Sequence, residues 1–348
     1  MAPSGGNPGE STNLKRRFFS FPTLISLALA GAFLVFVATR FDVDVGATWE
    51  QVRGGNPWYL ALAFLVHYST FIFRGARWRL LLRNTQGDDA PVPGVLYCSQ
   101  LLLLGWFANA VGWLRLGDAY RAYLHRDEQG ASFPRTIGTI LAERTLDAIL
   151  VVLMLAAAVP FLVSDTGRAA WAVLGLAVVL VFLLAFVLAA MTWAREWTLR
   201  KLPDRLSEHY RRFQEGTMGS FRRVLPATVL GLLGWLAEVG RLYLVVQALD
   251  LDLGLAVIVF LTLANSLLTL FPTPGGLGAV ESGVSGLAVR LSSLASSAAV
   301  AMVLVDRAIS YASIIALGAL VFVLRQAFRR RSSGTGRPLV QPGSVEDR

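Results

Sequence analysis

Long runs without a charged residue alternate along the chain with short segments that are rich in arginine. Two of these runs are "TLISLALAGAFLVFVAT" at residues 23–39 and "WAVLGLAVVLVFLLAFVLAAMTW" at residues 171–193. A helix of about 20 apolar residues is long enough to cross the hydrocarbon core of a bilayer. The pattern therefore predicts several helices that cross a membrane.

The same pattern contains long spans and two shorter apolar stretches, 93–112 and 277–290. The second stretch is too short to cross unaided, because a helix rises only about 1.5 Å per residue. The predicted fold is an all-α, polytopic bundle of about 7–9 membrane segments, including one or two short broken or re-entrant helices. The long spans are expected near 21–39, 57–82, 136–160, 169–193, 225–249, 255–271 and 297–324.

Arginine and lysine gather in alternate connections, and the positive-inside rule predicts that these connections face the cytoplasm together with both termini. These basic connections can all face the cytoplasm only if the stretch 93–112 enters and leaves the membrane on the cytoplasmic side, or if it has a partner span that the pattern does not show. The stretch 277–290 is likewise either a half-helix paired with the break at 272–276 or a re-entrant helix. The basic segments are 15–17, 74–83, 115–135, 194–224 and 325–331.

One membrane domain, residues 21–331, is expected to occupy most of the 348 residues. Residues 1–20 form a cytoplasmic tail before it. Residues 332–348 are polar and rich in glycine and serine, so they are expected to be disordered. Residues 194–224 are expected to form a cytoplasmic loop with an amphipathic helix on the membrane surface.

The composition argues against several classes of function. The net charge is +9, almost all of it from arginine in short connections, which suits an anionic membrane surface better than nucleic acid. Cys98 is the only cysteine and the three histidines lie far apart, so neither a disulfide framework nor a metal site is expected. Nucleotide-binding, serine-hydrolase and zinc-protease motifs are absent, so no cofactor is expected and catalysis is the less favoured function.

The segment "LLTLFPTPGGLGAVESGVSGLAV", residues 267–289, is an apolar stretch that is interrupted and then resumes with an acid. Backbone groups freed by such a break are tolerated in a membrane where they are buried in protein or line a wet cavity. We expect Gly275, Gly276 and Gly278 to break a helix there, with Glu281 in the first turn of the next one. The alternative is a surface loop that places Glu281 among lipid headgroups.

A second polar group, in "FANAVGWLRLGDAYRAYLHR", follows the other short stretch. On a helix that begins near Gly117, Asp118 and Arg121 share a face. Two arginines at a membrane boundary, Arg115 and Arg121, can hold a phosphate through forked hydrogen bonds. The alternative is that they are positive-inside residues with snorkelling side chains. That alternative is preferred for two further cations of this region, Arg126 and Arg135, whereas Asn109 joins the candidate site.

Charged residues also lie within predicted spans, where they are costly and usually paired. In "TILAERTLDAILVVLML", Glu143 and Asp147 are four residues apart and point the same way, while Arg144 can reach a neighbouring helix. A substrate role and an internal ion pair that fixes packing remain alternatives for these three residues.

Two later spans carry charges as well. Arg307, in "AMVLVDRAISYASIIALGAL", is expected to pair with Glu281 or Glu143, or with a lipid phosphate. Asp306 precedes it. In "GWLAEVGRLYLVVQ", Glu238 and Arg241 are three residues apart, which predicts a mutual ion pair.

These motifs and their order along the chain resemble the flippase-like membrane region of lysylphosphatidylglycerol synthase. The resemblance covers almost the whole chain, and "PGGLGxxE" is its most specific part. One departure is Trp113, which stands near a position where the family often has proline. The matching segments are "RGARWRLLL" at 74–82, N-x7-G-D-x-x-R from Asn109 to Arg121, "ERTLD" at 143–147, "PTPGGLGAVE" at 272–281, and Arg307.

The resemblance implies a polytopic domain that binds or moves a polar lipid. The chain ends soon after its last predicted span, so a stand-alone member without the aminoacyl-transferase domain is expected, and the synthase activity is not.

The predicted function is therefore binding and translocation of a membrane phospholipid or lipid-linked substrate across the cytoplasmic membrane. One alternative is a non-transporting, lipid-binding partner of an envelope-lipid or glycosylation enzyme. Another is a membrane-embedded transferase that uses Glu281 or Asp118 as a base. The expected protein partner is such an enzyme or a second copy of the chain.

Overall fold

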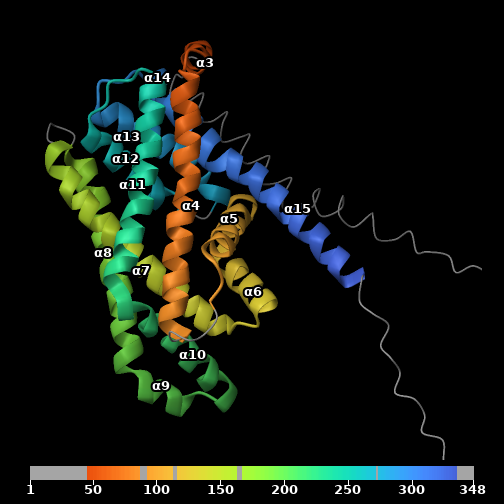
Figure 1. Cartoon of the computed structure of the whole chain (residues 1–348). Coiled ribbons are helices and arrows are strands. Elements are labelled where there is room, and N and C mark those ends of the chain that lie inside the picture. Colours follow the sequence, from red (N-terminus) through yellow and green to blue (C-terminus); the bar gives the residue numbers. More distant parts are fainter. Residues whose placement is uncertain (1–44, 87–91, 113–115, 163–166, 272, 335–348) are drawn as a thin grey trace, which may run out of the picture.

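The computed structural model describes residues 45–86, 92–112, 116–162, 167–271 and 273–334, and all regular elements among them are helical (Figure 1). Five helices of this part of the chain are long and apolar enough to cross a membrane. The all-α bundle predicted from the sequence is thus confirmed. The predicted span 21–39, the tail 1–20 and residues 335–348 of the predicted C-terminal tail lie outside the described residues.

The long helices follow the predicted spans closely, because each apolar run is bounded by glycine, proline or charged residues. The first described helix is the short α3 (Val45–Arg53). The last long helix is built from α14 and α15, which are joined by a π-helical turn, η4. The bounds are α4 (Pro57–Gln86), α7 (Phe133–Ala158) with the 3-10 turn η1 (Val159–Leu162), α8 (Gly167–Trp193), α11 (Val224–Ala248), α14 (Ser296–Arg307), η4 (Ala308–Ala312) and α15 (Ser313–Gly334).

The short stretch at 93–112 forms α5 (Val95–Val111), which packs against α6 (Gly117–Gln129) as a helical hairpin. The hairpin begins near the end of α4, where Arg79 Nε donates to the carbonyl of Pro93 at 3.0 Å. It returns to the same end of the bundle, where Glu128 pairs with Arg325 near the end of the last long helix. This course agrees with the re-entrant interpretation.

A second hairpin lies at the opposite end of the bundle. It consists of α12 (Leu255–Leu268), the 3-10 turn η3 (Pro274–Gly276) and α13 (Ala279–Leu291), and α12 and α13 pack against each other. Figure 1 shows them on the side of α3, whereas α6 and α10 lie toward the other end. The turn η3 packs against α5, so the two hairpins meet inside the molecule.

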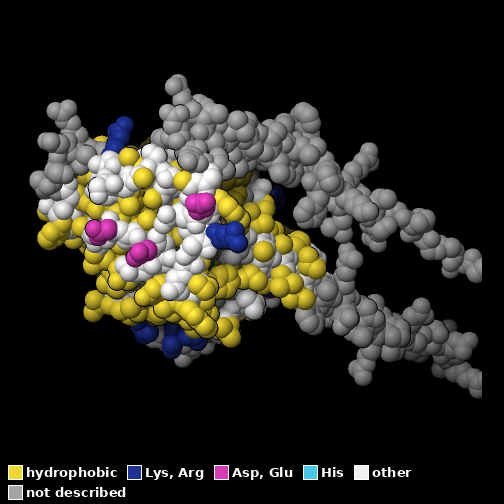
Figure 2. Space-filling model, turned by 90° about the horizontal axis from the view of Figure 1, so that it is seen from above, with side chains coloured by type: hydrophobic (Ala, Val, Ile, Leu, Met, Phe, Trp, Pro, Cys, Tyr) yellow, Lys and Arg dark blue, Asp and Glu magenta, His cyan; other side chains and the backbone are white. Residues whose placement is uncertain are grey.

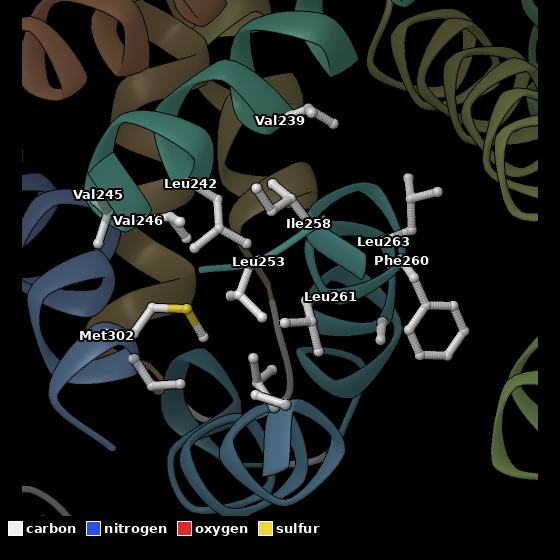
Figure 3. Close-up of a cluster of buried hydrophobic side chains, with 14 of the residues drawn as sticks. Val239, Leu242, Val245, Val246, Leu253, Ile258, Phe260, Leu261, Leu263 and Met302 are labelled. Atoms are coloured by element: carbon white, nitrogen blue, oxygen red, sulfur yellow. The ribbon is translucent and has the colours of Figure 1, made fainter. Parts of the chain in front are cut away.

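The main hydrophobic core joins the second hairpin to α11 and α14 (Figure 3). Ile258 and Phe260 of α12, Val245 of α11 and Met302 of α14 are fully buried in it. Branched and thioether side chains fill this space without polar atoms that would need partners. The core therefore fixes the hairpin that carries the predicted break.

The outer surface of the long helices is apolar. Phe182 and Phe186 of α8 are 71% and 70% exposed, and Trp193 at its end is 91% exposed. In Figure 2, which shows the end with α3 from above, hydrophobic and uncharged surface predominates and charged side chains are sparse. Large apolar side chains around the bundle are the surface that a bilayer requires.

The segment 194–224 is helical, and its second helix is packed on the bundle. It contains α9 (Arg195–Lys201), α10 (Asp204–Ser220) and the 3-10 turn η2 (Phe221–Arg223), and α10 packs against α7 and α4. The backbones of α7 and α10 cross closely because both helices have glycine there. A Cβ atom added to Gly216 would lie 2.1 Å from the carbonyl oxygen of Arg135. The position of this segment at a membrane surface stays a prediction.

We expect Gly216→Ala to detach α10 partly from α7, because the added methyl group overlaps backbone that cannot rotate away. Overpacking of this kind costs about 1–3 kcal/mol. Limited proteolysis of purified protein should then cleave within 194–224 faster than in the wild type. Gly175→Ala, on α8 with no atom within 4 Å of the added Cβ, is the matched control. Equal cleavage rates in the two variants would contradict the tight crossing.

Candidate functional site

A buried ion-pair cluster lies where α4 meets α7. The Arg77 guanidinium donates to Asp147 Oδ1 at 2.7 Å and to Glu143 Oε1 at 3.1 Å. Arg77 is fully buried and Glu143 is 1% exposed. Glu143 lies ten residues beyond Phe133, where α7 begins, and so well inside the helix. Such groups are stable at this depth because each charge has a partner with hydrogen bonds.

The cluster continues to α6 and becomes accessible there. Arg121 Nη2 donates to Glu143 Oε2 at 2.8 Å, so this arginine is held inside the bundle. Arg144 reaches across to α6, as predicted, and its Nε and Nη2 donate to the two oxygens of Asp118 at 3.1 and 3.0 Å. The side chains of Arg144 and Asp118 are 37% and 36% exposed, whereas that of Arg121 is 1% exposed.

Tryptophan rings cover the cations of this cluster. The guanidinium carbon of Arg74 lies 5.0 Å from the Trp235 ring centroid and 5.5 Å from that of Trp106. Arg121 lies 4.5 Å from the Trp78 ring centroid. An aromatic face attracts a desolvated cation, so these rings partly replace lost hydration. They also tie α4, α5 and α11 to the same charges.

A second cluster joins α4, α11 and α14. Arg241 pairs with Glu238, as the spacing predicted, and its Nε also donates to Asp306 Oδ1 at 2.8 Å. His67 Nδ1 lies 3.1 Å from Arg241 Nη1. All four side chains are buried. The local pair was predictable from the sequence, whereas the link to Asp306 comes from packing.

At the predicted break, 272–281, the carboxylate of Glu281 accepts hydrogen bonds from two partners. Gly278 N–H donates to Glu281 Oε2 at 2.6 Å, so Glu281 caps the first turn of α13. The other oxygen, Oε1, accepts from Arg307 Nε at 2.7 Å. Arg307 Nη2 also donates to the freed carbonyl of Gly275 at 3.0 Å. The predicted pairing of Arg307 with Glu281 is therefore confirmed, and the surface-loop alternative is wrong because Glu281 is 8% exposed.

Tyr311 connects this break to the other hairpin. Its ring lies 4.2 Å from the Arg307 guanidinium carbon, and its hydroxyl donates to the carbonyl of Ala110 at the end of α5. The hydroxyl bond is 2.8 Å long. Arg307 is the last residue of α14 and Tyr311 lies in the π-helical turn η4. Single π turns inside α-helices are frequent at functional sites, because they re-aim side chains.

The charges that pair inside the described part of the bundle balance. Six arginines that contact carboxylates in the bundle face six carboxylates, so an anion that enters has to exchange with a carboxylate for its arginine. The arginines are Arg74, Arg77, Arg121, Arg144, Arg241 and Arg307, and the carboxylates are Asp118, Glu143, Asp147, Glu238, Glu281 and Asp306.

The remaining predicted site residues either fix the backbone conformation of the two hairpins or lie outside the described part of the chain. Asn109 Oδ1 accepts from Gly117 N–H at 2.7 Å and so closes the tip of the first hairpin. Gly275, Gly276 and Gly278 have φ angles of 58°, 71° and 93°, which favour glycine. Arg115 lies outside the described residues, as does Trp113. Substrate contact by any residue of the predicted set stays a prediction.

The sequence pattern placed Arg74 and Arg77 in the basic segment 74–83, which was expected to face the cytoplasm. The structure buries both, 4% and 0% exposed, because α4 continues to Gln86 and their turn faces α7. Their three-residue spacing within "RGARWRLLL", which puts both side chains on one face of a helix, was the feature of the sequence that could have indicated their common burial. Trp235, His67 and Tyr311 had no sequence signal of their own, since each lies in an otherwise ordinary apolar run.

The described residues contain no group of three or more His, Cys, Asp or Glu side chains placed to hold a metal ion. The charged clusters consist instead of arginine–carboxylate pairs, which is a chemistry suited to binding phosphate or carboxylate groups rather than cations.

Comparison with known proteins places the chain in one family. The sequence model described as "Lysylphosphatidylglycerol synthase TM region" matches residues 23–318. A UPF0104 membrane protein of Methanocaldococcus jannaschii is 29% identical over 222 residues, which are 63% of this chain and 94% of that protein. A UPF0104 membrane protein of Methanothermobacter thermautotrophicus is 27% identical over 331 residues, 88% of this chain and 92% of its own.

The resemblance found in the motifs is thus confirmed over the region that contains both hairpins, the two charged clusters and the Arg307–Glu281 pair. The chain is a membrane protein with multiple apolar helices, and it belongs to the lysylphosphatidylglycerol synthase transmembrane-region family.

Proposed function

We propose that the protein binds a polar or anionic lipid and translocates it across the cytoplasmic membrane. The observation that carries this proposal is the Arg307–Glu281 pair, which lies at the junction of two hairpins that approach each other from opposite ends of the bundle. Transporter binding sites are commonly built where discontinuous helices meet near the middle of a bilayer. Such a site can be reached from either side by small movements of the hairpins.

Arg307 is the group best placed to bind a phosphate. Its Nε and Nη2 contact Glu281 and Gly275, whereas no described residue accepts a hydrogen bond from its Nη1. A lipid phosphate that approaches Nη1 would replace Glu281 as the counter-ion and form the forked contact that arginine favours. Glu281 would keep its hydrogen bond from Gly278 N–H at the start of α13, so the exchange does not leave the carboxylate without a partner.

The accessible pair Asp118–Arg144 offers a second polar position near the first hairpin. Both side chains are more than one third exposed, in contrast to Arg77 and Glu143 behind them. A zwitterionic or cationic headgroup could contact Asp118 while its phosphate contacts Arg144. In this proposal Arg77, Glu143 and Asp147 hold the helices in register and do not touch the lipid.

The orientation that we propose puts the termini and the arginine-rich end in the cytoplasm. The ends of α4 and α6, the start of α7, α10 and the end of α15 share that end through contacts such as Arg325 with Glu128 and Arg135 with Glu215. Basic residues at one end satisfy the positive-inside rule for all of these connections. No nucleotide-binding motif occurs in the chain, so the movement would follow a lipid gradient or an ion gradient, or depend on a partner.

Reconstitution in vesicles with fluorescent phosphatidylglycerol tests the proposal. Dithionite quenching of the outer leaflet should show transbilayer exchange by the wild type, and Arg307→Ala should slow it at least about tenfold, the effect of losing one charge-assisted contact. Arg290→Ala, an exposed arginine at the end of α13, is the matched control.

Thermal unfolding in detergent verifies that Arg307→Ala and the control are folded, and Arg307→Lys tests whether charge alone suffices. Equal exchange rates for wild type and Arg307→Ala would remove the pair from the mechanism. No exchange by the wild type, together with a stoichiometric co-purified enzyme, would instead support a lipid-binding partner without transport.

A further inference from the structure

A cleft of about 710 Å³ opens at the arginine-rich end, away from the interior pairs. It is bounded by the end of α6, the start of α7 and α10, which Figure 1 shows together at that end. No carboxylate is among the described residues that line it. The polar lining includes Arg126, Arg135, Arg212, His125 and His209.

His125 is the first sign that the cleft is a built site. The side chain is 1% exposed, yet neither Nδ1 nor Nε2 has a hydrogen-bond partner among the described residues. The ring packs edge-on against Trp78, with centroids 5.5 Å apart, and lies 6.3 Å from the Tyr97 centroid. Buried polar atoms are nearly always satisfied, so a partner from outside the chain is indicated.

The start of α7 supplies a second sign. Ser132 is the N-cap of this 26-residue helix, but its side chain makes no capping bond and its buried Oγ has no partner among the described residues. Ser132, Phe133 and Arg135 all line the cleft. The N-terminus of a long helix carries unpaired N–H groups and a partial positive charge, which favours an anion.

Three arginines complete an electropositive wall. Arg135 pairs with Glu215 at 2.8 Å, and Arg212 pairs with Glu208 at 2.7 Å. The hydrogen bond from Arg212 lowers the pKa of Glu208, so that carboxylate stays ionised and holds its arginine in place. Arg126, in the last turn of α6, has no ion-pair partner among the described residues. The wall thus retains positive charge after its internal pairs are counted.

We propose that this cleft binds a phosphate ester, with His125 and Ser132 donating to its oxygens and Arg126 and Arg135 neutralising its charge. The site is separate from the Arg307–Glu281 pair and does not depend on lipid translocation. The same chemistry fits the phosphate of a lipid headgroup in the adjacent leaflet and that of a soluble metabolite. The acyl chains of the ligand distinguish these two sources.

Calorimetric titration of the full chain in neutral detergent at fixed salt tests the site with two probes, glycerol 3-phosphate and dihexanoyl phosphatidic acid. At least one should bind, and the double change Arg126→Ala with Arg135→Ala should weaken binding about 100-fold, since each lost charged contact contributes about tenfold. His125→Phe keeps the ring against Trp78 but removes both nitrogens, and should weaken binding about fivefold.

The matched control is the double change Arg200→Ala with Arg205→Ala, which removes the same charge from exposed positions at the same end. It should leave the affinity within about twofold of the wild type, because screened surface charge acts weakly at this range. Tighter binding of the dihexanoyl probe assigns the site to a lipid headgroup, and equal binding assigns it to a soluble ester. Equal weakening by the control double variant, or no binding of either probe to the wild type, would overturn the proposal.

Discussion

Replacement of Arg77 by leucine is expected to lower the free energy of unfolding by about 3–5 kcal/mol, because it leaves buried carboxylates without their main cation. Asp147 would retain Arg74 at 3.5 Å and the Trp235 indole N–H at 3.2 Å, while Glu143 would retain Arg121. Those contacts are fewer than the charges need at this depth. Unfolding of the variant in mixed micelles of increasing denaturing detergent measures the loss.

The matched control is Arg79→Leu, two residues further along α4. Arg79 is half-buried and donates to the carbonyl of Pro93 rather than to a carboxylate. Its replacement should cost about 1 kcal/mol, the value of one hydrogen bond. Adding Asp147→Asn to Arg77→Leu should recover part of the stability, because it removes the one negative charge that is left in excess when Arg77 is lost. A loss for Arg77→Leu no larger than for Arg79→Leu would show that the cluster is hydrated and not structural.

Alanine at Gly275 is expected to disrupt the break in the second hairpin and to abolish lipid exchange. The residue has φ of 58°, and an added Cβ would lie 2.1 Å from Cε2 of Tyr311. The conformation alone costs about 1–2 kcal/mol for a residue with a side chain. The overlap also pushes Tyr311 away from Arg307 and from the carbonyl of Ala110, which it holds at the junction of the hairpins.

A double change separates these two effects. Tyr311→Leu in the Gly275→Ala background relieves the overlap, so stability should return to within about 1–2 kcal/mol of the wild type, the cost of the backbone conformation. Lipid exchange should stay low because the contact with Ala110 is lost. Gly286→Ala is the control, since nothing lies within 4 Å of the added Cβ and alanine favours the α13 helix by up to about 1 kcal/mol. If Gly275→Ala were as stable and active as Gly286→Ala, the break would not be a strained, functional feature.

The interior arginines differ in their exposure to solvent and in their partners, and this difference suggests different roles for them. Arg77 and Arg121 contact the same carboxylate, Glu143, and are shielded from solvent. Arg144 is 37% exposed, and Arg307 keeps one terminal nitrogen without a described acceptor. In the function that we propose, the first two therefore stabilise the bundle and the last two contact the headgroup.

Much of the fold could be predicted from the sequence, because helix formation in a membrane depends on local hydrophobicity. Each backbone group in hydrocarbon needs an internal partner, so an uncharged run of sufficient length becomes a helix whatever its neighbours are. The break at 272–281 was predictable for the same reason, since proline and three glycines cannot continue a helix. The pairing of Arg307 with Glu281 was predicted as one of three alternatives, because a buried cation requires a partner.

The sequence alone thus determined the apolar helices, the arginine-rich end and the position of the break. Only the tertiary structure decided which polar groups come together: Arg241 with Asp306, Arg121 with Glu143, and His125 with Arg135 and Arg212 along one cleft. The physical reason is the distance along the chain over which each interaction acts. Hydrophobicity and glycine act within a few residues, whereas an ion pair or a cleft between distant segments depends on how whole helices rotate and cross when they pack.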